Sequence, residues 1–188
     1  MAFVLSAMTS PYLVPAVLAV AVTASLARSA RDFILWCAVS TLFSVVVPFV
    51  YVYWGVCSGR ISDIHVRLRE QRERPFAVAL VGACVGIILL QLLGAPRPLI
   101  FLGVCYVVNG IVLALITLAW KISMHCAVFA ACLTAAAIFY GKPALFLFFL
   151  LPAAAWARVQ RGRHTLSQVI AGIPVSAAIT AIVLKLLM

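Results

Sequence analysis

Acidic residues are almost absent from this chain of 188 residues, since only Asp32, Asp63, Glu70 and Glu73 carry a carboxylate. Enzymes that hold a diphosphate through magnesium need paired carboxylate clusters, so a helical prenyltransferase site is not expected. Charged residues of either sign make up only 10% of the chain, and 66% of the residues are hydrophobic. Soluble domains have about 25% charged residues. The composition therefore excludes an ordinary soluble domain and predicts a polytopic membrane protein.

The charge that is present is one-sided, with 14 Lys and Arg residues and a net charge of +10. These cations are scattered through short segments between apolar runs, without interleaved aromatic residues or a solvated domain to carry them. We therefore expect no nucleic-acid partner. Membrane orientation and an anionic substrate are the roles that we expect for the basic residues.

The six cysteines lack the spacing of metal ligands or of a disulfide framework. Each falls within or at the end of an apolar stretch, where a free cysteine acts as a small packing residue. Residues 1–12 lack the cationic region of a secretory signal peptide, so we expect them to remain in the mature fold. We expect residues 1–188 to form one integral membrane domain, with a functional core at about 57–170.

Seven apolar runs predict an all-α membrane bundle of six to seven transmembrane helices. Two of the runs are shorter than the roughly 20 residues that a perpendicular crossing needs, so they either extend into the loops or form a re-entrant pair. The runs are Pro11–Ala27, Phe33–Val56, Phe76–Leu93, Leu99–Trp120, Thr165–Met188 and the two short ones, Cys126–Tyr140 and Pro143–Trp156.

All three histidines lie in basic segments between these runs. Two crossings separate each such segment from the next, so all three emerge on one side of the membrane if every run crosses. That side carries nine Lys and Arg residues and the other side five, which favours a cytoplasmic location under the positive-inside rule. The segments are 57–75 with His65, 121–125 with His125, and 157–164 with His164.

In the first segment, Arg67 and Arg74 are seven residues apart. On a helix this spacing places them two turns apart on one face, where both could reach the same anion. Glu70 precedes Arg74 by four residues, as Arg69 precedes Glu73, which gives the alternative of a salt-bridged surface helix.

The second segment joins the Ser123 hydroxyl, the Met124 backbone amide and the His125 imidazole at the start of an apolar run. A helix N-terminus attracts anions, so this combination indicates a possible phosphate contact. The alternative is a histidine that only packs at the membrane interface.

The third segment places Arg158 six residues before His164. Gln168 follows His164 by four residues, one helical turn, and its side chain is within reach of the imidazole. The three segments together supply three arginines and two imidazoles to one face.

The order and spacing of these residues resemble the type 2 phosphatidic acid phosphatase superfamily between residues 67 and 168. The first motif of that family is Lys, six residues, Arg-Pro, and it corresponds to Arg67 and Arg74-Pro75. The second is Pro-Ser-Gly-His, and the third is Ser-Arg, five residues, His, three residues, Asp. They correspond to Ile122-Ser123-Met124-His125 and to Ala157-Arg158, His164 and Gln168.

The resemblance implies a lipid phosphatase that needs no metal or other cofactor and works through a phosphohistidine intermediate. His164 would be the nucleophile, and His125 would be the general acid on the leaving oxygen and later the base that activates water. The groups that would bind the phosphoryl oxygens are Arg67, Arg74, Arg158, the Ser123 hydroxyl and the Met124 amide. A polyprenyl phosphate or diphosphate, a prenyl-linked sugar phosphate, phosphatidate and phosphatidylglycerol phosphate all fit as substrates.

The main departure from the family pattern is Gln168, because an aspartate there would orient the nucleophile and stabilise its developing charge. Asp63 is the candidate for a substitute carboxylate, since it is predicted on the same face. Two alternatives stay open. One is a non-catalytic relative that binds or transports lipid phosphates, and the other is a metal site formed by Asp63, His65, His125 and His164.

Overall fold

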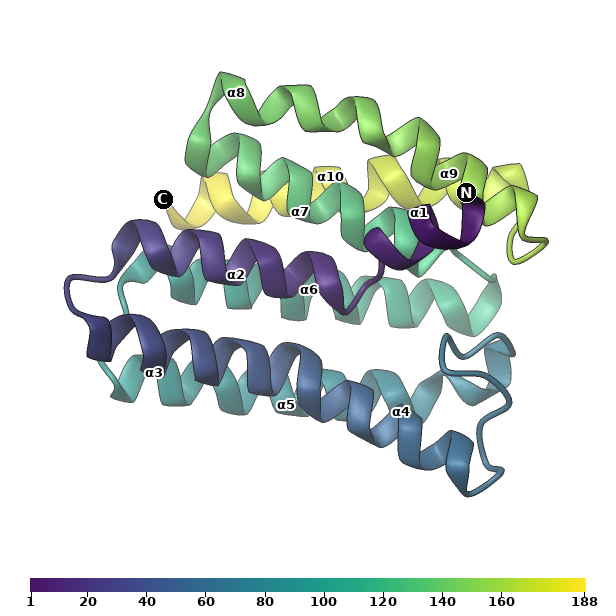
Figure 1. Ribbon diagram of the computed structural model, residues 1–188, viewed down its shortest axis with the longest axis horizontal. Helices are drawn as coiled ribbons and strands as arrows, with labels where there is room; N and C mark the ends of the chain where they lie inside the picture. The colour runs from purple at the N-terminus through teal and green to yellow at the C-terminus, as the bar shows by residue number, and fades with distance from the viewer.

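The computed structural model describes all 188 residues, and its secondary structure is entirely helical (Figure 1). This confirms the predicted all-α fold. The helices are α1 (Ala2–Met8), α2 (Leu13–Leu26), α3 (Ala30–Thr41), α4 (Val47–Cys57), α5 (Glu73–Leu92), α6 (Arg97–Ala119), α7 (Met124–Tyr140), α8 (Lys142–Leu145), α9 (Leu150–Gln160) and α10 (Leu166–Leu187). A π-helical turn, Leu42–Val46, joins α3 to α4, and 3-10 turns occupy Arg69–Gln71 and Phe146–Phe149.

Five helical units are long and apolar enough to cross a membrane by length and composition. The bent pair α1 and α2, with 43° between the two helices, counts as a sixth if it is one span. The short run Pro143–Trp156 belongs to a helix of 19 residues, Lys142–Gln160, because it extends into both flanking loops. The other short run lies in α7, which has only 17 residues and is too short for this count.

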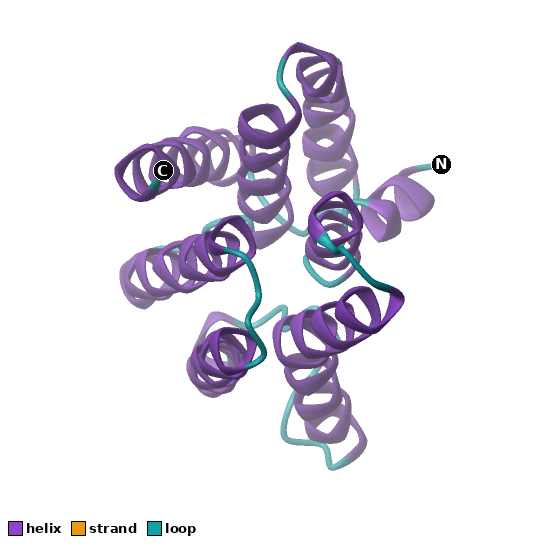
Figure 2. Ribbon diagram, turned by 90° about the vertical axis from the view of Figure 1, so that its left-hand side faces the viewer, coloured by secondary structure: helices purple, strands orange, loops and turns teal.

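Helix α7 occupies a central position, with α10 packed along it and α2 and α9 against its other sides. Helices α5 and α6 pack against each other, and α5 also contacts α3 and α4. Figure 2 shows these helices end on. The loops after α4, α6 and α9 lie at the same end of the bundle as α1, opposite the C-terminus (Figure 1). We call this end the basic end.

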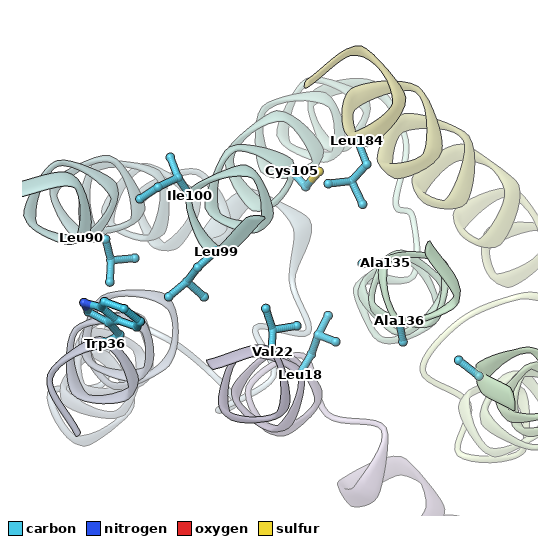
Figure 3. Packing of buried hydrophobic residues seen from close by; sticks show 11 residues of the cluster. Leu18, Val22, Trp36, Leu90, Leu99, Ile100, Cys105, Ala135, Ala136 and Leu184 are labelled. Atoms are coloured by element: carbon cyan, nitrogen blue, oxygen red, sulfur yellow. The ribbon is translucent and has the colours of Figure 1, made fainter. Parts of the chain in front are cut away.

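The largest cluster of buried hydrophobic side chains lies toward the opposite end (Figure 3). It joins side chains from α2, α3, α5, α6, α7, α8 and α10, and the Trp36 indole donates a hydrogen bond to the Leu93 carbonyl over 3.3 Å. Close packing there fixes how the helices are rotated relative to one another. Their other ends, which carry the histidines, are therefore held in register.

Candidate functional site

The first turn of α10 holds His164 in a defined orientation. Thr165 and Gln168 form a capping box, in which Gln168 Oε1 accepts a hydrogen bond from the Thr165 backbone amide over 3.2 Å. The same oxygen lies 3.1 Å from His164 Nδ1. Because an amide oxygen can only accept, the Nδ1 atom must carry the proton in this contact. The lone pair of the imidazole is then on Nε2, where it is available for attack or for ligand binding.

The start of α7 is bound directly to the start of α10. The Ser123 backbone amide donates a hydrogen bond to the Gln168 carbonyl over 3.1 Å. Gly172 permits this approach, since a Cβ atom there would lie only 3.2 Å from the Ser123 carbonyl oxygen. His125, in the first turn of α7, is only 3% exposed. The second and third basic segments therefore form one site.

Two polar side-chain atoms at the start of α7 are buried without a hydrogen-bond partner, Ser123 Oγ and His125 Nε2. Buried polar atoms nearly always have a partner, so such atoms suggest a place for water or a ligand. Both belong to residues that the sequence had predicted as site residues. Met124, between them, is partly buried.

His65 lies against His125, with 5.2 Å between the ring centroids and an angle of 35° between the ring planes. Asp63 orients it: Oδ1 accepts a hydrogen bond from the His65 amide over 2.8 Å and lies 3.5 Å from His65 Nδ1. The other oxygen of Asp63 accepts a hydrogen bond from Arg163 Nη1 over 3.0 Å. Asp63 therefore links the first segment to the third. It is not the substitute carboxylate expected beside His164, because the hydrogen-bond partner of His164 is Gln168.

Burial raises the pKa of Asp63, but the hydrogen bonds from His65 and Arg163 outweigh it and keep the pKa below the ordinary value. For His65, burial lowers the pKa and the nearby arginines add to this, while Asp63 opposes them. The carboxylate therefore stays ionised at neutral pH, and His65 stays mostly neutral.

Arg158 is buried at the end of α9, with 3% of its surface exposed. Its Nη1 atom donates a hydrogen bond to Ser6 Oγ over 2.7 Å, and its Nε atom has no partner. The same Ser6 oxygen accepts a hydrogen bond from Arg161 over 3.0 Å. Neither arginine pairs with a carboxylate. A buried guanidinium without a counter-charge is costly, which makes the position favourable for an anion.

Arg72 is a second buried cation, which the sequence analysis did not identify. It is 6% exposed and donates hydrogen bonds to the Val66 and Ile122 carbonyls, over 3.0 Å and 3.2 Å. Val66 has a φ of 46°, a strained value for a β-branched residue. Arg72 therefore fixes a strained loop and ties the first segment to the second. Nothing in the sequence distinguishes it from the neighbouring arginines.

The prediction that Arg67 and Arg74 share one face of a helix is wrong. Arg67 lies in the loop that follows α4, whereas Arg74 lies in the first turn of α5, and both are exposed. The extended backbone of Leu68, with φ −78° and ψ 132°, interrupts any helix between the two arginines, and Pro75 is tolerated because α5 begins only two residues before it.

The alternative of a salt-bridged surface helix is also wrong. The expected pairs of Glu70 with Arg74 and of Arg69 with Glu73 do not form. Arg69 instead lies 3.7 Å from the neighbouring Glu70 carboxylate, and its Nη1 atom donates a hydrogen bond to the Leu118 carbonyl over 2.9 Å.

Cations from all three segments surround His164. Burial lowers its pKa to about 3, with Arg158, Arg72 and Lys121 lowering it further and the hydrogen bond to Gln168 opposing them. The pKa of Lys121 is also lowered, first by burial and then by Arg72 and other arginines. Such a concentration of positive charge keeps the imidazole neutral and attracts a phosphate.

We therefore expect His164 to titrate near pH 3 in the ligand-free protein. NMR of protein with labelled histidines checks this, and the His164→Gln variant assigns the signal. Between about pH 6.5 and pH 3 the unfolded chain binds this proton and the folded protein does not, so acid lowers the stability in that window. A midpoint near the ordinary value of 6.5 would contradict the described environment.

A cavity of about 230 Å³ extends into the bundle from the part of the site around His125, and His164 and Arg158 are not among its lining residues. Its wall includes His65, Arg72 and His125 at the basic end and continues between α2, α3, α4, α5, α6 and α7. Most of the lining side chains are hydrophobic. A polar, cationic end and an apolar interior therefore belong to one continuous space.

No group of three or more His, Cys, Asp or Glu side chains is arranged to hold a metal ion. Asp63, His65, His125 and His164 do not form a ligand set, although His65 lies against His125. Comparisons with protein-family models, with curated proteins and with solved structures find no match for the chain. We therefore infer the function from the geometry of the site.

Proposed function

We propose that the chain is an integral membrane phosphatase, which hydrolyses a lipid phosphate monoester or diphosphate through a phosphohistidine at His164. The observation that carries the proposal is the burial of His125, His164, Arg72 and Arg158 at one end of the bundle, with no carboxylate paired to either arginine. Cations hold a phosphate and imidazoles transfer it, so this set provides both requirements.

In the first step, His164 Nε2 attacks phosphorus while the bond from phosphorus to the lipid oxygen breaks. His125 donates its proton to that oxygen, and the leaving group is an alcohol from a monoester or the lipid monophosphate from a diphosphate. In the second step, His125 takes a proton from water as the water oxygen attacks phosphorus. The phosphorus–nitrogen bond breaks, inorganic phosphate leaves, and His164 is regenerated.

Arg158 and Arg72 are the buried cations available to stabilise the phosphoryl oxygens in both steps, with the Ser123 hydroxyl as a further donor. Arg67 and Arg74 are exposed at the same end and would attract the anion at longer range. A bound phosphate dianion also raises the pKa of the surrounding imidazoles, which favours the protonated general acid.

Gln168 can maintain the tautomer of His164 but supplies no negative charge. We expect Gln168→Asp to be tolerated or to raise turnover, because Gln168 Oε1 lies 3.1 Å from Nδ1 and a carboxylate near this position would stabilise the imidazole as it becomes positive. Steady-state kinetics on a lipid phosphate checks this, with Gln168→Asn as the control for the altered length. Complete loss of turnover in a folded Gln168→Asp protein would count against the assignment.

The lipid part of the substrate and the cytoplasmic location of the site are also proposals. Five or six helices of membrane-spanning length and the apolar cavity support a lipid substrate.

The excess of Lys and Arg on the side of the membrane that carries the histidines supports a cytoplasmic location of the site. Cys57 is exposed at that side, so a membrane-impermeant thiol reagent should label it only when applied from the cytoplasmic face.

Phosphate release from a panel of lipid phosphates, by purified protein in detergent with and without chelator, tests the proposal. We expect release from at least one substrate at a rate that the chelator does not change. Loss of activity after chelation would favour the metal alternative. Binding without release, for every substrate, would favour a lipid-phosphate binding or transport protein.

A further inference from the structure

The cavity beside the site runs along the helices instead of lying across them. Residues from both ends of α5 line it, from Phe76 to Leu90, and so do residues of α6 from Leu113 to Leu99. The 14-residue separation on α6 corresponds to a depth of roughly 21 Å. The cavity is therefore long and leads from the cationic groups into the apolar interior.

The volume of the cavity is small for such a length. An engineered apolar cavity of about 150 Å³ holds a single benzene molecule. The 230 Å³ here are distributed over this depth of roughly 21 Å, which leaves width for one hydrocarbon chain. Two acyl chains side by side would need the helices to separate.

The wall between α5 and α6 is closed by tight packing around two glycines. A Cβ atom at Gly103 would lie 2.8 Å from the Ile87 side chain, and one at Gly110 would lie 2.8 Å from Leu80. These contacts bring the two helices close together, so a chain in the cavity cannot pass outward between α5 and α6 at these positions. The small side chains of Ala83 and Ala131 also line the cavity and keep it open within the bundle.

We infer that the substrate is a lipid phosphate with a single hydrocarbon chain, isoprenoid or monoacyl, whose chain occupies this cavity while its phosphate meets Arg72 and His125. The inference rests on the proposed phosphatase function and narrows its substrate class. Phosphatidate and phosphatidylglycerol phosphate, which have two chains, are excluded as preferred substrates. Burial of the chain beside the site positions the phosphorus for attack.

The first test compares three substrates in mixed micelles at equal surface concentration: farnesyl phosphate, a monoacyl lysophosphatidate and dioleoyl phosphatidate. Phenyl phosphate, which has no chain, reports the chemistry alone. For the wild type we expect kcat/KM to be roughly tenfold or more higher for both single-chain substrates than for phosphatidate, because apolar burial supplies binding energy.

The second test fills the cavity from two walls, with Ala83→Leu in α5 and Ala131→Leu in α7. Each should lower kcat/KM for farnesyl phosphate by roughly tenfold, and should lower it less for phenyl phosphate, which has no chain to place in the cavity. Val81→Leu is the matched control, because Val81 lies on α5 and is 65% exposed. Thermal unfolding of all three variants identifies any that fail to fold.

The outcomes separate the two proposals. If no substrate releases phosphate, the phosphatase function fails and this inference fails with it. If phosphatidate and farnesyl phosphate are hydrolysed equally well, the function stands and the single-chain inference is overturned. Unchanged farnesyl phosphate turnover in both folded cavity-filling variants would overturn it as well.

Discussion

Replacing His164 with alanine is expected to lower phosphate release from a lipid phosphate by about 10³-fold or more, since a nucleophile that forms a covalent intermediate has no substitute. The measurement is kcat and kcat/KM of the purified variant on the best substrate of the wild type. The side chain of His164 makes one hydrogen bond, to Gln168, so the fold should persist in its absence.

Leu166→Ala is a suitable control for this experiment, because Leu166 lies two residues away in the same turn and is 60% exposed. It should retain nearly full activity. Equal activity in wild type and His164→Ala would show that the nucleophile is a different group, and His125 would then be the first to examine.

Replacing Arg158 with alanine is expected to lower kcat by about 10²–10³-fold, as removal of one preorganised donor to a developing oxyanion does. Arg158→Lys should recover only part of this loss, because lysine retains the charge but lacks the planar fork that contacts two oxygens. The measurement is again kcat, with the affinity for inorganic phosphate as a second value.

Arg161→Ala is the matched control, since Arg161 donates to the same Ser6 hydroxyl and is more exposed than Arg158. It should retain most of the activity. The stability of Arg158→Ala distinguishes a functional role from a structural one. Removal of the Arg158 side chain leaves no buried carboxylate unpaired, so the melting temperature of the ligand-free Arg158→Ala variant should not fall sharply. Full activity with a large loss of stability would assign Arg158 a structural role.

Much of the fold could be predicted from the sequence because helix positions follow from local hydrophobic runs. The run Phe76–Leu93 overlaps most of α5 (Glu73–Leu92), and the run Thr165–Met188 contains α10, since such runs depend on residues near in the chain. Helix ends within the loops were harder. The short run Pro143–Trp156 left two alternatives open, a re-entrant pair or extension into the loops, and the structure has a helix from Lys142 to Gln160.

Contacts within one local segment of the site could be predicted from the sequence. Contacts between different loops could not. The pair His164 and Gln168 follows from helical spacing, and the structure has the contact. Arg72 was missed because its burial depends on the strained turn at Val66, and no residue pattern marks a positive φ at a valine. The contact of Arg158 with Ser6 joins residues 152 positions apart, which spacing in the sequence cannot reveal.

The most direct test of the account is to trap the phosphorylated protein. Wild type is mixed with a substrate labelled with ³²P, quenched within the first turnover and analysed for bound label. We predict label that is stable to alkali and lost in acid, as expected of a phosphohistidine, on a peptide that contains His164. The label should accumulate in His125→Ala with a substrate whose leaving group needs no proton, because this variant lacks the base that activates water. It should be absent from His164→Ala. Label that persists in a folded His164→Ala protein would contradict the account.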